Sequence, residues 1–525
     1  MKATMKSLLI CLTLTISLSS AENILFYFPI GSYSHRIPVW PLVTHLADQG
    51  HQVTFLSAYP PKDPHPNVTE IVPEEFGMLF DQMGETSVVG LRRSGLVPEG
   101  WAFLGVMGIQ FCEVFISNPE YQEWINNSKF DLVVIDGLFN DCGLGLAHKF
   151  KAKHITYATS APCMWQIDGF GMIPEANWIP DMQYYFPIQM NIIERLKTAY
   201  NTLSWHRRRE NEYFPKLEQV LKTHLNISDL PPLREIEQNV SLVLLNSHFS
   251  EEFARSLPPH VIPVGGMHIQ NKTKPLPKVI DDFINKGDKG FVFISFGSHV
   301  KLAKEPPEVY AAIMGAMKKL NINFIFKWDG DVPADIPPNV LMQKWISQQD
   351  ILAHPKIKAF VTHSGLMSIT EAIFHGVPLV SLPVTAEQDY NAERIHARGY
   401  GVRLEIGSLT ENDLVDAIYK VVNDPSYKSS VLLKSKQYKD RPMKPLDTAI
   451  WWTEFVLRHD DTSFLKPMSI YQSWWRRRSL DIYGIAFVGL ALIFVIALNF
   501  LQIIVKLVKG NNSSNGTQVK AKKQD

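Results

Sequence analysis

The chain has 525 residues, more than one hydrophobic core usually serves, which suggests two domains with additional segments. Its 52 basic and 52 acidic residues balance, so the composition gives no reason to expect a nucleic acid as a partner. Only Cys112, Cys142 and Cys163 follow the first 21 residues, so at most one internal disulfide is expected and a disulfide-rich scaffold is excluded.

The first 21 residues have the pattern of a secretory signal peptide. A basic start is followed by an apolar run and by small residues at Ser19 and Ala21, so we expect cleavage after Ala21. A retained N-terminal membrane helix is the alternative, disfavoured because the apolar run is short.

An alternation of buried strands and helices follows and predicts a Rossmann-like domain over residues 22–263. The expected strands are 23–29, 51–57, 130–136, 154–159 and 241–247, and a helix is expected over 37–49. The stretches 60–128 and 165–233 lack clean periodicity and are rich in aromatic residues, Met and Pro. We interpret them as insertions that form an apolar pocket, and helical core is the competing interpretation.

A second α/β half begins after the Gly-, Pro- and Lys-rich stretch 264–278, which has the composition of an interdomain linker. This half covers residues 279–440, with strands expected at 290–296, 322–328, 358–362 and 378–384 and helices at 306–319 and 366–374. A closing amphipathic helix is expected over 441–460. It belongs to a segment, 441–475, that ends close to the predicted membrane span.

Residues 482–505 carry no charge over 24 positions, which is long enough to cross a bilayer, and Trp474 and Trp475 precede them as interfacial aromatics do. With the signal peptide, this predicts a type I protein whose body is luminal and whose tail, 506–525, is cytosolic. Three arginines on the luminal flank (476–478) weaken this orientation, and five tail lysines offset them. Lys522 and Lys523 resemble the dilysine retrieval signal of endoplasmic-reticulum membrane proteins, so we expect that compartment.

Five glycosylation sequons fall on the predicted luminal side, at Asn67, Asn126, Asn226, Asn239 and Asn271. Asn239 precedes a predicted strand, so we expect it to be too buried for use. The sequons of the tail, at Asn511, Asn512 and Asn515, should be silent.

Residues 345–391 are the most informative stretch, because polar residues follow successive apolar elements. His363, Ser364 and Gly365 occupy a predicted strand-to-helix turn, where free backbone N–H groups and the positive helix end can receive a pyrophosphate. Carboxyl ends of strands are where open parallel sheets bind ligands.

These 47 positions resemble the nucleotide-sugar signature of UDP-glycosyltransferases. The matching residues are Trp345, Gln348, His363, Ser368, Glu371, Glu387, Gln388 and Asn391. The resemblance implies the GT-B fold, two Rossmann-like domains facing a cleft, here with a C-terminal transmembrane helix. It also implies that Trp345 stacks on uracil, that Glu371 accepts the ribose hydroxyls, and that the Glu387-Gln388 pair binds the sugar.

The sequence departs from the family pattern at Ser364, where many animal members have glycine, and at Glu387, where Asp is commoner. Both departures leave the sugar open between glucose and glucuronate and tilt the prediction slightly towards glucose.

His35 and Asp136 are the predicted catalytic residues. His35 follows the first strand, in its turn to the helix, where an imidazole can take a proton near neutral pH. Asp136 ends a strand that neighbours the first one in a Rossmann order, so both side chains should meet at one sheet edge. UDP-glycosyltransferases carry a His and an Asp at these places, and Gly297-Ser298 resembles their phosphate-contacting turn. Asp141 competes with Asp136, but we expect it to cap the following helix.

The sequence thus predicts a membrane-anchored UDP-glycosyltransferase that moves a hexose, with inversion, to a hydroxyl of a small lipophilic acceptor. We find no clustered His and Cys spacing and expect no metal and no cofactor besides the UDP-sugar co-substrate. The expected partners are the donor, the acceptor and the bilayer, and homo-oligomerisation stays open. The alternatives are a glycolipid or sterol transferase and a protein that binds UDP-sugar or lipophiles without turnover.

Overall fold

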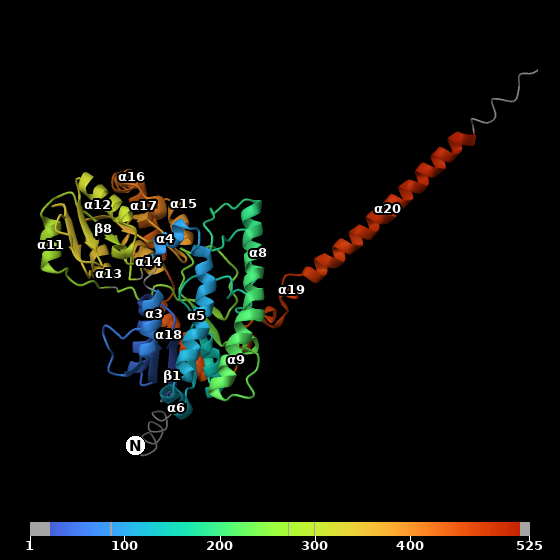
Figure 1. The fold of residues 1–525 in the computed structure, drawn as a ribbon, viewed down its shortest axis with the longest axis horizontal. Helices are drawn as coiled ribbons and strands as arrows, with labels where there is room; N and C mark the ends of the chain where they lie inside the picture. Colours follow the sequence, from blue (N-terminus) through green and yellow to red (C-terminus); the bar gives the residue numbers. More distant parts are fainter. Residues whose placement is uncertain (1–20, 84–86, 271, 299, 515–525) are drawn as a thin grey trace, which may run out of the picture. The chain divides into compact units, whose positions relative to one another are not determined.

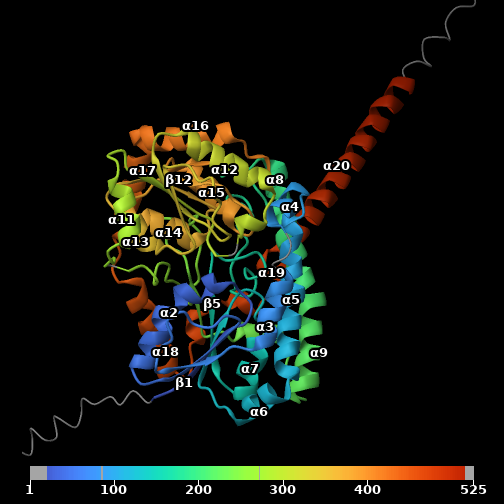
Figure 2. The same cartoon turned by 60° about the vertical axis from the view of Figure 1, so that its left-hand side comes forward.

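The structure is a computed structural model that describes residues 21–83, 87–270, 272–298 and 300–514 (Figures 1 and 2). The chain forms two compact units, Met1–Pro467 and Met468–Asp525. Residues 1–20 of the predicted signal peptide, Asn271 and the tail residues Lys522 and Lys523 lie outside the described residues.

Two parallel sheets organise the first unit, which confirms the predicted pair of Rossmann-like halves. The first has seven strands in the order β3-β2-β1-β4-β5-β6-β7 and the second has six in the order β10-β9-β8-β11-β12-β13. The strands of the first are β1 Asn23–Phe28, β2 Gln52–Ser57, β3 Val68–Ile71, β4 Leu132–Asp136, β5 Lys153–Ala158, β6 Leu242–Leu245 and β7 Val261–Pro263. Those of the second are β8 Phe291–Ser295, β9 Asn323–Lys327, β10 Val340–Gln343, β11 Ile357–Thr362, β12 Leu379–Ser381 and β13 Gly401–Arg403.

Both sheets are buried on both faces, as continuous apolar strands require. Along β1, Ile24 and Phe26 pack into one core and Leu25 and Tyr27 into another, and all four are fully buried. In each sheet the chain reverses its strand order once, between β1 and β4 and between β8 and β11. Such a switch point opens a crevice at the carboxyl ends of the strands, where open α/β sheets bind ligands.

Helices cover the sheets and fill the connections between strands. In the first half they are α2 Tyr33–Asp48, α3 Glu74–Met83, α4 Val88–Arg93, α5 Val97–Ser117, α6 Pro119–Asn127, α7 Cys142–Phe150, α8 Ile192–Arg208, η1 Arg209–Tyr213, α9 Phe214–Leu225 and α10 Leu233–Gln238. In the second half they are α11 Lys278–Asn285, η2 Leu302–Lys304, α12 Pro307–Lys319, α13 Gln348–Leu352, α14 Leu366–His375, α15 Gln388–Ala397, η3 Ile406–Ser408, α16 Glu411–Asn423 and α17 Pro425–Lys439. The closing helix α18 spans Pro445–Arg458 and is followed by η4 Ser463–Leu465.

Two segments cross from one half to the other. Helix α18 follows the second half but returns beside α2, and its Ala449 and Val456 are buried in the core on one face of the first sheet (Figure 2). Helix α4 belongs to the first half by sequence, yet Val89 is buried in a core of the second half. The predicted amphipathic closing helix is therefore present, and its apolar side serves the N-terminal sheet.

The two stretches that we interpreted as pocket-forming insertions contain more helix than that interpretation predicts. Within 60–128, α5 buries Phe111 and Phe115 in the main core of the first half, so the competing interpretation as helical core is correct there. Within 165–233, residues 165–191 are mostly turns and loops, and α8 and α9 follow them.

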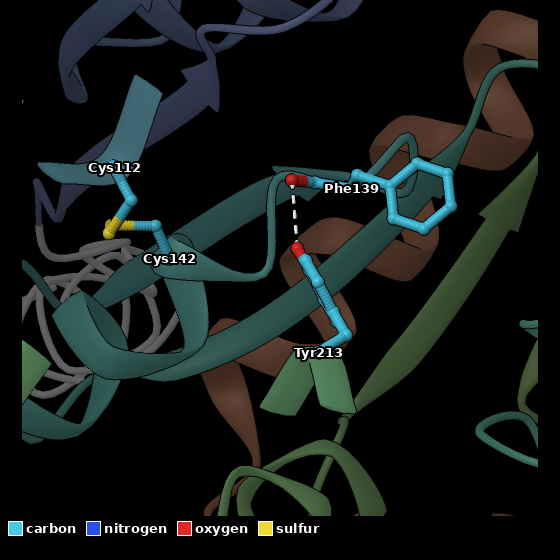
Figure 3. The surroundings of a disulfide bond; sticks show 4 residues. All are labelled: Cys112, Phe139, Cys142 and Tyr213. Carbon is cyan, nitrogen blue, oxygen red and sulfur yellow. Dashed lines mark hydrogen bonds between the residues drawn. A yellow bond between two sulfur atoms is a disulfide. The ribbon is translucent and has the colours of Figure 1, made fainter. Parts of the chain in front are cut away.

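A disulfide between Cys112 and Cys142 joins α5 to α7 (Figure 3). Cys163 is a buried free thiol. Beside it, the Tyr213 hydroxyl donates a 3.1 Å hydrogen bond to the carbonyl of Phe139. Phe139 has a positive φ of 53° in the turn that follows β4. The disulfide and this hydrogen bond thus hold the turn between Asp136 and α7.

The C-terminal unit contains η5 Met468–Tyr471, α19 Trp474–Arg477 and α20 Leu480–Ser514. Among the described residues, α20 is the one unbroken helix long and apolar enough to cross a membrane; the candidate span is Leu480–Lys509, and an 18-residue window within it has a mean hydropathy of 2.6. It includes the predicted span 482–505.

Four predicted glycosylation sites lie in the described part of the chain, and all four asparagines are exposed: Asn67, Asn126, Asn226 and Asn239. The expectation that Asn239 is buried is wrong. It is the C-cap residue of α10, three positions before β6 begins at Leu242.

Candidate active site

His35 and Asp136 meet at the switch point of the first sheet. His35 Nδ1 lies 2.8 Å from Asp136 Oδ2, and the Asp136 carboxylate is fully buried. Our placement of His35 in the strand-to-helix turn is wrong by a few residues, because α2 begins at Tyr33 and His35 lies in its first turn. Two prolines, Pro38 and Pro41, lie inside this helix.

The loop around this pair leaves room for the imidazole ring. Gly31 has a φ of +136°, and a Cβ there would lie 2.7 Å from Cγ of His35. Glycine is therefore required twice at this position, by the backbone angle and by the approach of the ring.

Asn140 is a site residue that the sequence analysis missed. Its Nδ2 donates to Asp136 Oδ2 (3.1 Å) and to the carbonyl of Ile30 (3.0 Å), while its Oδ1 accepts from the N–H of Ile30 (2.8 Å). One amide thus fixes the aspartate and the end of β1 together. A polar residue four positions after Asp136 was the available signal.

The expected cap at Asp141 is not formed. Asp141 is the N-cap residue of α7 but makes no side-chain cap hydrogen bond. Its carboxylate instead pairs with Arg209 at 2.6 Å, an interaction between distant segments that local sequence does not indicate.

The pKa of His35 is raised above its ordinary value. Burial by itself favours the neutral ring, but the Asp136 carboxylate outweighs it through its charge and its hydrogen bond, and the charge of Glu387 adds to the effect. Glu387 belongs to the second half, so the donor-signature segment lies near enough to His35 for its charge to act on the histidine. Nδ1 is engaged by Asp136, so Nε2 is the ring nitrogen left to take a proton.

On the second half, His363 lies between two glycines. A Cβ at Gly297 would lie 2.7 Å from Cε1 of His363, and one at Gly365 would lie 2.6 Å from its Nε2. The predicted phosphate turn after β8 and the predicted turn after β11 therefore meet at this ring. Ser298, next to Gly297, is exposed.

Ser364 adopts a backbone conformation that favours glycine. Its φ is +66°, it is fully buried, and its Oγ has no hydrogen-bond partner among the described residues. Asn391 Nδ2 donates to its carbonyl at 3.0 Å. The serine thus stands in a strained position at the point where the family pattern has glycine.

Glu371 lies in a buried polar cluster on α14. Its Oε2 accepts from Gln348 Nε2 at 2.7 Å, and Gln348 also lies 3.2 Å from the Ser368 hydroxyl. Nε2 of His268 lies 3.4 Å from Glu371 Oε1. The predicted residues Gln348, Ser368 and Glu371 thus lie together. His268, from the linker, joins them and was not predicted from the sequence.

Glu387 and Gln388 contact the protein backbone in this structure. Glu387 Oε1 accepts from the N–H of Leu366 (3.2 Å), the first residue of α14, and burial raises the pKa of Glu387. Gln388 Oε1 accepts from the N–H groups of Val384 (2.9 Å) and Thr385 (3.1 Å). One N–H group of the predicted anion-binding helix end is therefore occupied by the longer carboxylate of Glu387.

Helix α4 reaches the same region from the first half. Arg92 forms two hydrogen bonds to Asp389 (2.6 and 2.8 Å) and two to Glu405 (2.6 and 2.7 Å). Glu305 accepts from the Ser87 hydroxyl at 2.6 Å and from the N–H of Val89 at 3.0 Å. Asp389 directly follows the Glu387-Gln388 pair, so α4 ties the two halves beside the predicted sugar site.

A small cavity of about 50 Å³ lies in the region interpreted as an apolar pocket. Its lining includes Met164, Ile167 and Met182 from the irregular segment, Thr198 from α8 and Tyr390 from α15. Within the described ranges, no group of three His, Cys, Asp or Glu residues is arranged to hold a metal ion.

The two Rossmann-like halves have the GT-B fold, which solved glycosyltransferases share. The calicheamicin glycosyltransferase CalG4 matches with a TM-score of 0.56 at 18% identity, over 84% of this chain and 99% of that one. The glycosyltransferase VinC, solved in complex with dTDP, matches with a TM-score of 0.54 at 18% identity, over 83% of this chain and all of that one. At these identities the likeness shows the fold alone.

Sequence comparison identifies the family. The family described as "UDP-glucoronosyl and UDP-glucosyl transferase" matches residues 97–513. The UDP-glycosyltransferase UGT5 of Dactylopius coccus is 32% identical over 518 residues, covering 96% of this chain and 97% of its own. The UDP-glucuronosyltransferase 2B7 of Homo sapiens is 29% identical over 527 residues, covering 96% and 98%. The chain belongs to this family and is a UDP-glycosyltransferase.

Proposed function

We propose that the chain transfers a hexose, glucose or glucuronic acid, from UDP to a hydroxyl of a small lipophilic acceptor, with inversion at the anomeric carbon. The observation that carries the proposal is the His35–Asp136 contact of 2.8 Å. It lies where Glu387 of the donor half is near enough to influence the histidine.

In the proposed reaction, His35 is the general base. Nε2 takes the proton of the acceptor hydroxyl while the acceptor oxygen attacks the anomeric carbon from the face opposite UDP. The bond between that carbon and the diphosphate oxygen breaks, and UDP leaves with the electron pair. Asp136 holds the proton on Nδ1 and stabilises the imidazolium that forms.

The donor residues take the roles that the family resemblance implies. Trp345 stacks on uracil, Glu371 with Gln348 binds the ribose, and the Glu387-Gln388 pair binds the hexose hydroxyls. The turns at Gly297-Ser298 and His363–Gly365, with Ser368 close by, receive the diphosphate, as a helix N-terminus favours anions. The dTDP bound to VinC shows that this fold accommodates a nucleoside diphosphate in another protein.

We propose that the protein is anchored by α20 in the endoplasmic-reticulum membrane as a single-pass type I protein with a luminal body. The apolar helix and four exposed sequons support this topology. No metal and no resident cofactor are part of the proposal.

The test is a donor and acceptor panel. Membranes that contain the full chain are offered UDP-glucose, UDP-glucuronate and other UDP-hexoses in turn, with phenols and sterols as acceptors, and UDP release and glycoside are measured. The proposal expects one UDP-hexose to give a soluble glycoside of inverted anomeric configuration. UDP binding without turnover for every pair would instead identify a binding protein, and product confined to membrane lipid would identify a glycolipid or sterol transferase.

A further inference from the structure

Lys62 reaches from the first half to the donor signature of the second. It lies between β2 and β3, and its ammonium is 3.6 Å from the centroid of the Trp345 ring and 4.7 Å from that of Tyr33. The backbone N–H of Lys62 also donates to the Tyr33 hydroxyl at 3.3 Å. Tyr33 precedes His35 by two residues, so Lys62 stands between the start of the catalytic helix and the residue proposed to bind uracil.

A second lysine, Lys327 at the end of β9, approaches the same ring. Its ammonium is 5.3 Å from the Trp345 centroid and donates a 2.7 Å hydrogen bond to the carbonyl of Gly297. Gly297 begins the proposed diphosphate turn and packs against His363. The two ammonium groups therefore flank the path from the uracil platform to the phosphate turn.

The two lysines repel each other, and the nearby charges of Asp63 and Asp329 offset this only in part. The pKa of Lys327 is lowered by burial and then by the charge of Lys62, and burial lowers the pKa of Lys62 as well. Across the described ranges, neither ammonium forms a salt bridge with an Asp or Glu residue. Two cations near one aromatic face, neither of them in a salt bridge, form a site that an anion stabilises.

We propose that Lys62 is a donor-binding residue contributed by the N-terminal half, whose ammonium pairs with the diphosphate of the UDP-sugar. The inference rests on the proposed function, because it takes the UDP-sugar as the donor. The lysine stem is flexible, so its head can leave the Trp345 face to uracil and move to the phosphates beside Lys327. Bound donor then connects the two halves through one side chain.

The alternative is that Lys62 only caps Trp345 at the surface. Trp345 is 60% exposed, and cation–π contacts at exposed sites are weak. The two interpretations differ in which part of the nucleotide senses the lysine: the diphosphate in our proposal, and at most the base in the alternative.

The test compares UDP with uridine as ligands of the full-length protein. Lys62→Met removes the charge and keeps the length of the side chain, so the affinity for UDP should fall about tenfold while that for uridine stays within about twofold. Lys62→Arg should restore most of the UDP affinity. The matched control is Lys344→Met, since Lys344 precedes Trp345 in the chain, is 72% exposed and lies away from the ring, 3.9 Å from Asp331.

Turnover provides a second readout. Lys62→Met should lower kcat/KM for the UDP-sugar by at least the loss in UDP affinity, because the diphosphate that loses its cation is also the leaving group. Equal losses for UDP and uridine, or an unchanged UDP affinity, would overturn the inference and leave the proposed function standing. A wild-type protein that binds no UDP would overturn both.

Discussion

Ser364 departs from the family pattern at a backbone position that favours glycine. A non-glycine residue at φ +66° carries strain of roughly 1–2 kcal/mol. The side chain also buries a hydroxyl that no described residue satisfies. Strain of this kind gathers at functional sites, and Ser364 lies between His363 and Gly365 of the proposed diphosphate turn.

We therefore expect Ser364→Gly to stabilise the protein by about 1 kcal/mol, the relief of strain exceeding the entropy that glycine loses on folding. Ser381 is the matched control: it is also fully buried with an unpartnered hydroxyl, but it lies in strand β12, where glycine is unfavourable. Thermal melting of the two variants should shift in opposite directions. A destabilised Ser364→Gly protein would show that the serine side chain contributes packing that outweighs the strain.

His35 makes the activity depend on pH in a definite direction. If it is the base, the neutral ring is the active form, so kcat/KM rises with pH through the pKa of His35. That pKa is raised above about 6.5, chiefly by Asp136 against the opposing effect of burial. Removing a nearby negative charge lowers the pKa.

Asp136→Asn and Glu387→Gln should each move the acid limb of the pH–rate profile to lower pH. Asp136→Asn should also lower the plateau, since the amide no longer stabilises the imidazolium. The measurement is kcat/KM across pH 5–9 with an acceptor that does not titrate in that range. An acid limb that stays in place in both variants would mean that another group controls it.

The sequence predicted these residues where local pattern and sheet topology suffice. His35 and Asp136 follow apolar strands that a Rossmann order places side by side, so their meeting could be predicted. Lys62 and His268 could not, because each lies in an irregular connection and approaches the site from a distant part of the chain. Asn140 lay close to Asp136 in sequence, but its role depends on the folded path of β1.

At the scale of elements, α4 is the segment that local sequence misplaces most. It has only six residues and follows a stretch without periodicity, yet it docks on the second half through Val89 and Arg92. Likewise, the amphipathic pattern of α18 predicts a helix but does not say which sheet it covers. The strands and helices of the donor signature were predicted well, because each has its own hydrophobic period.

Arg92→Met should lower the free energy of unfolding of the unit Met1–Pro467 by about 2 kcal/mol or more. The change leaves Asp389 and Glu405 without their guanidinium partner, but Arg403 still pairs with Asp389 and Glu405 is 42% exposed, so the loss should stay below that of a fully buried pair. Arg93→Met is the comparison on the same helix, since Arg93 is 38% exposed and contacts the second half more weakly, through Glu308 at 3.6 Å and the Gly407 carbonyl at 2.8 Å. Its effect should be within about 1 kcal/mol. A denaturation midpoint of Arg92→Met equal to that of the wild type would argue against α4 as a structural tie.

At the scale of the whole molecule, α20 decides where the chemistry takes place. Its apolar stretch, Leu480–Lys509, is 30 residues long, about 45 Å at 1.5 Å per residue, which exceeds the hydrocarbon thickness of a bilayer. The body carries exposed sequons, so a luminal orientation makes them accessible to glycosylation.

The full-length protein should therefore resist carbonate extraction and lose mass, by up to five glycans, on endoglycosidase treatment. Substituting each sequon asparagine by Gln should remove the shifts one by one, with Asn239 among the candidates because it is exposed. A protein that stays in the membrane after carbonate treatment but carries no glycan would contradict the luminal placement.

The most direct test of the account is the turnover of His35→Ala with its donor binding measured alongside. The variant should bind UDP nearly as the wild type does but lose turnover about 10²–10⁴-fold, because only the proton acceptor is removed. Adding Asp136→Asn should cost little more, since the two groups act as one unit. An acidic phenol that is already ionised at assay pH should recover part of the lost rate. Full activity of His35→Ala on a weakly acidic alcohol would contradict the mechanism and place the base elsewhere.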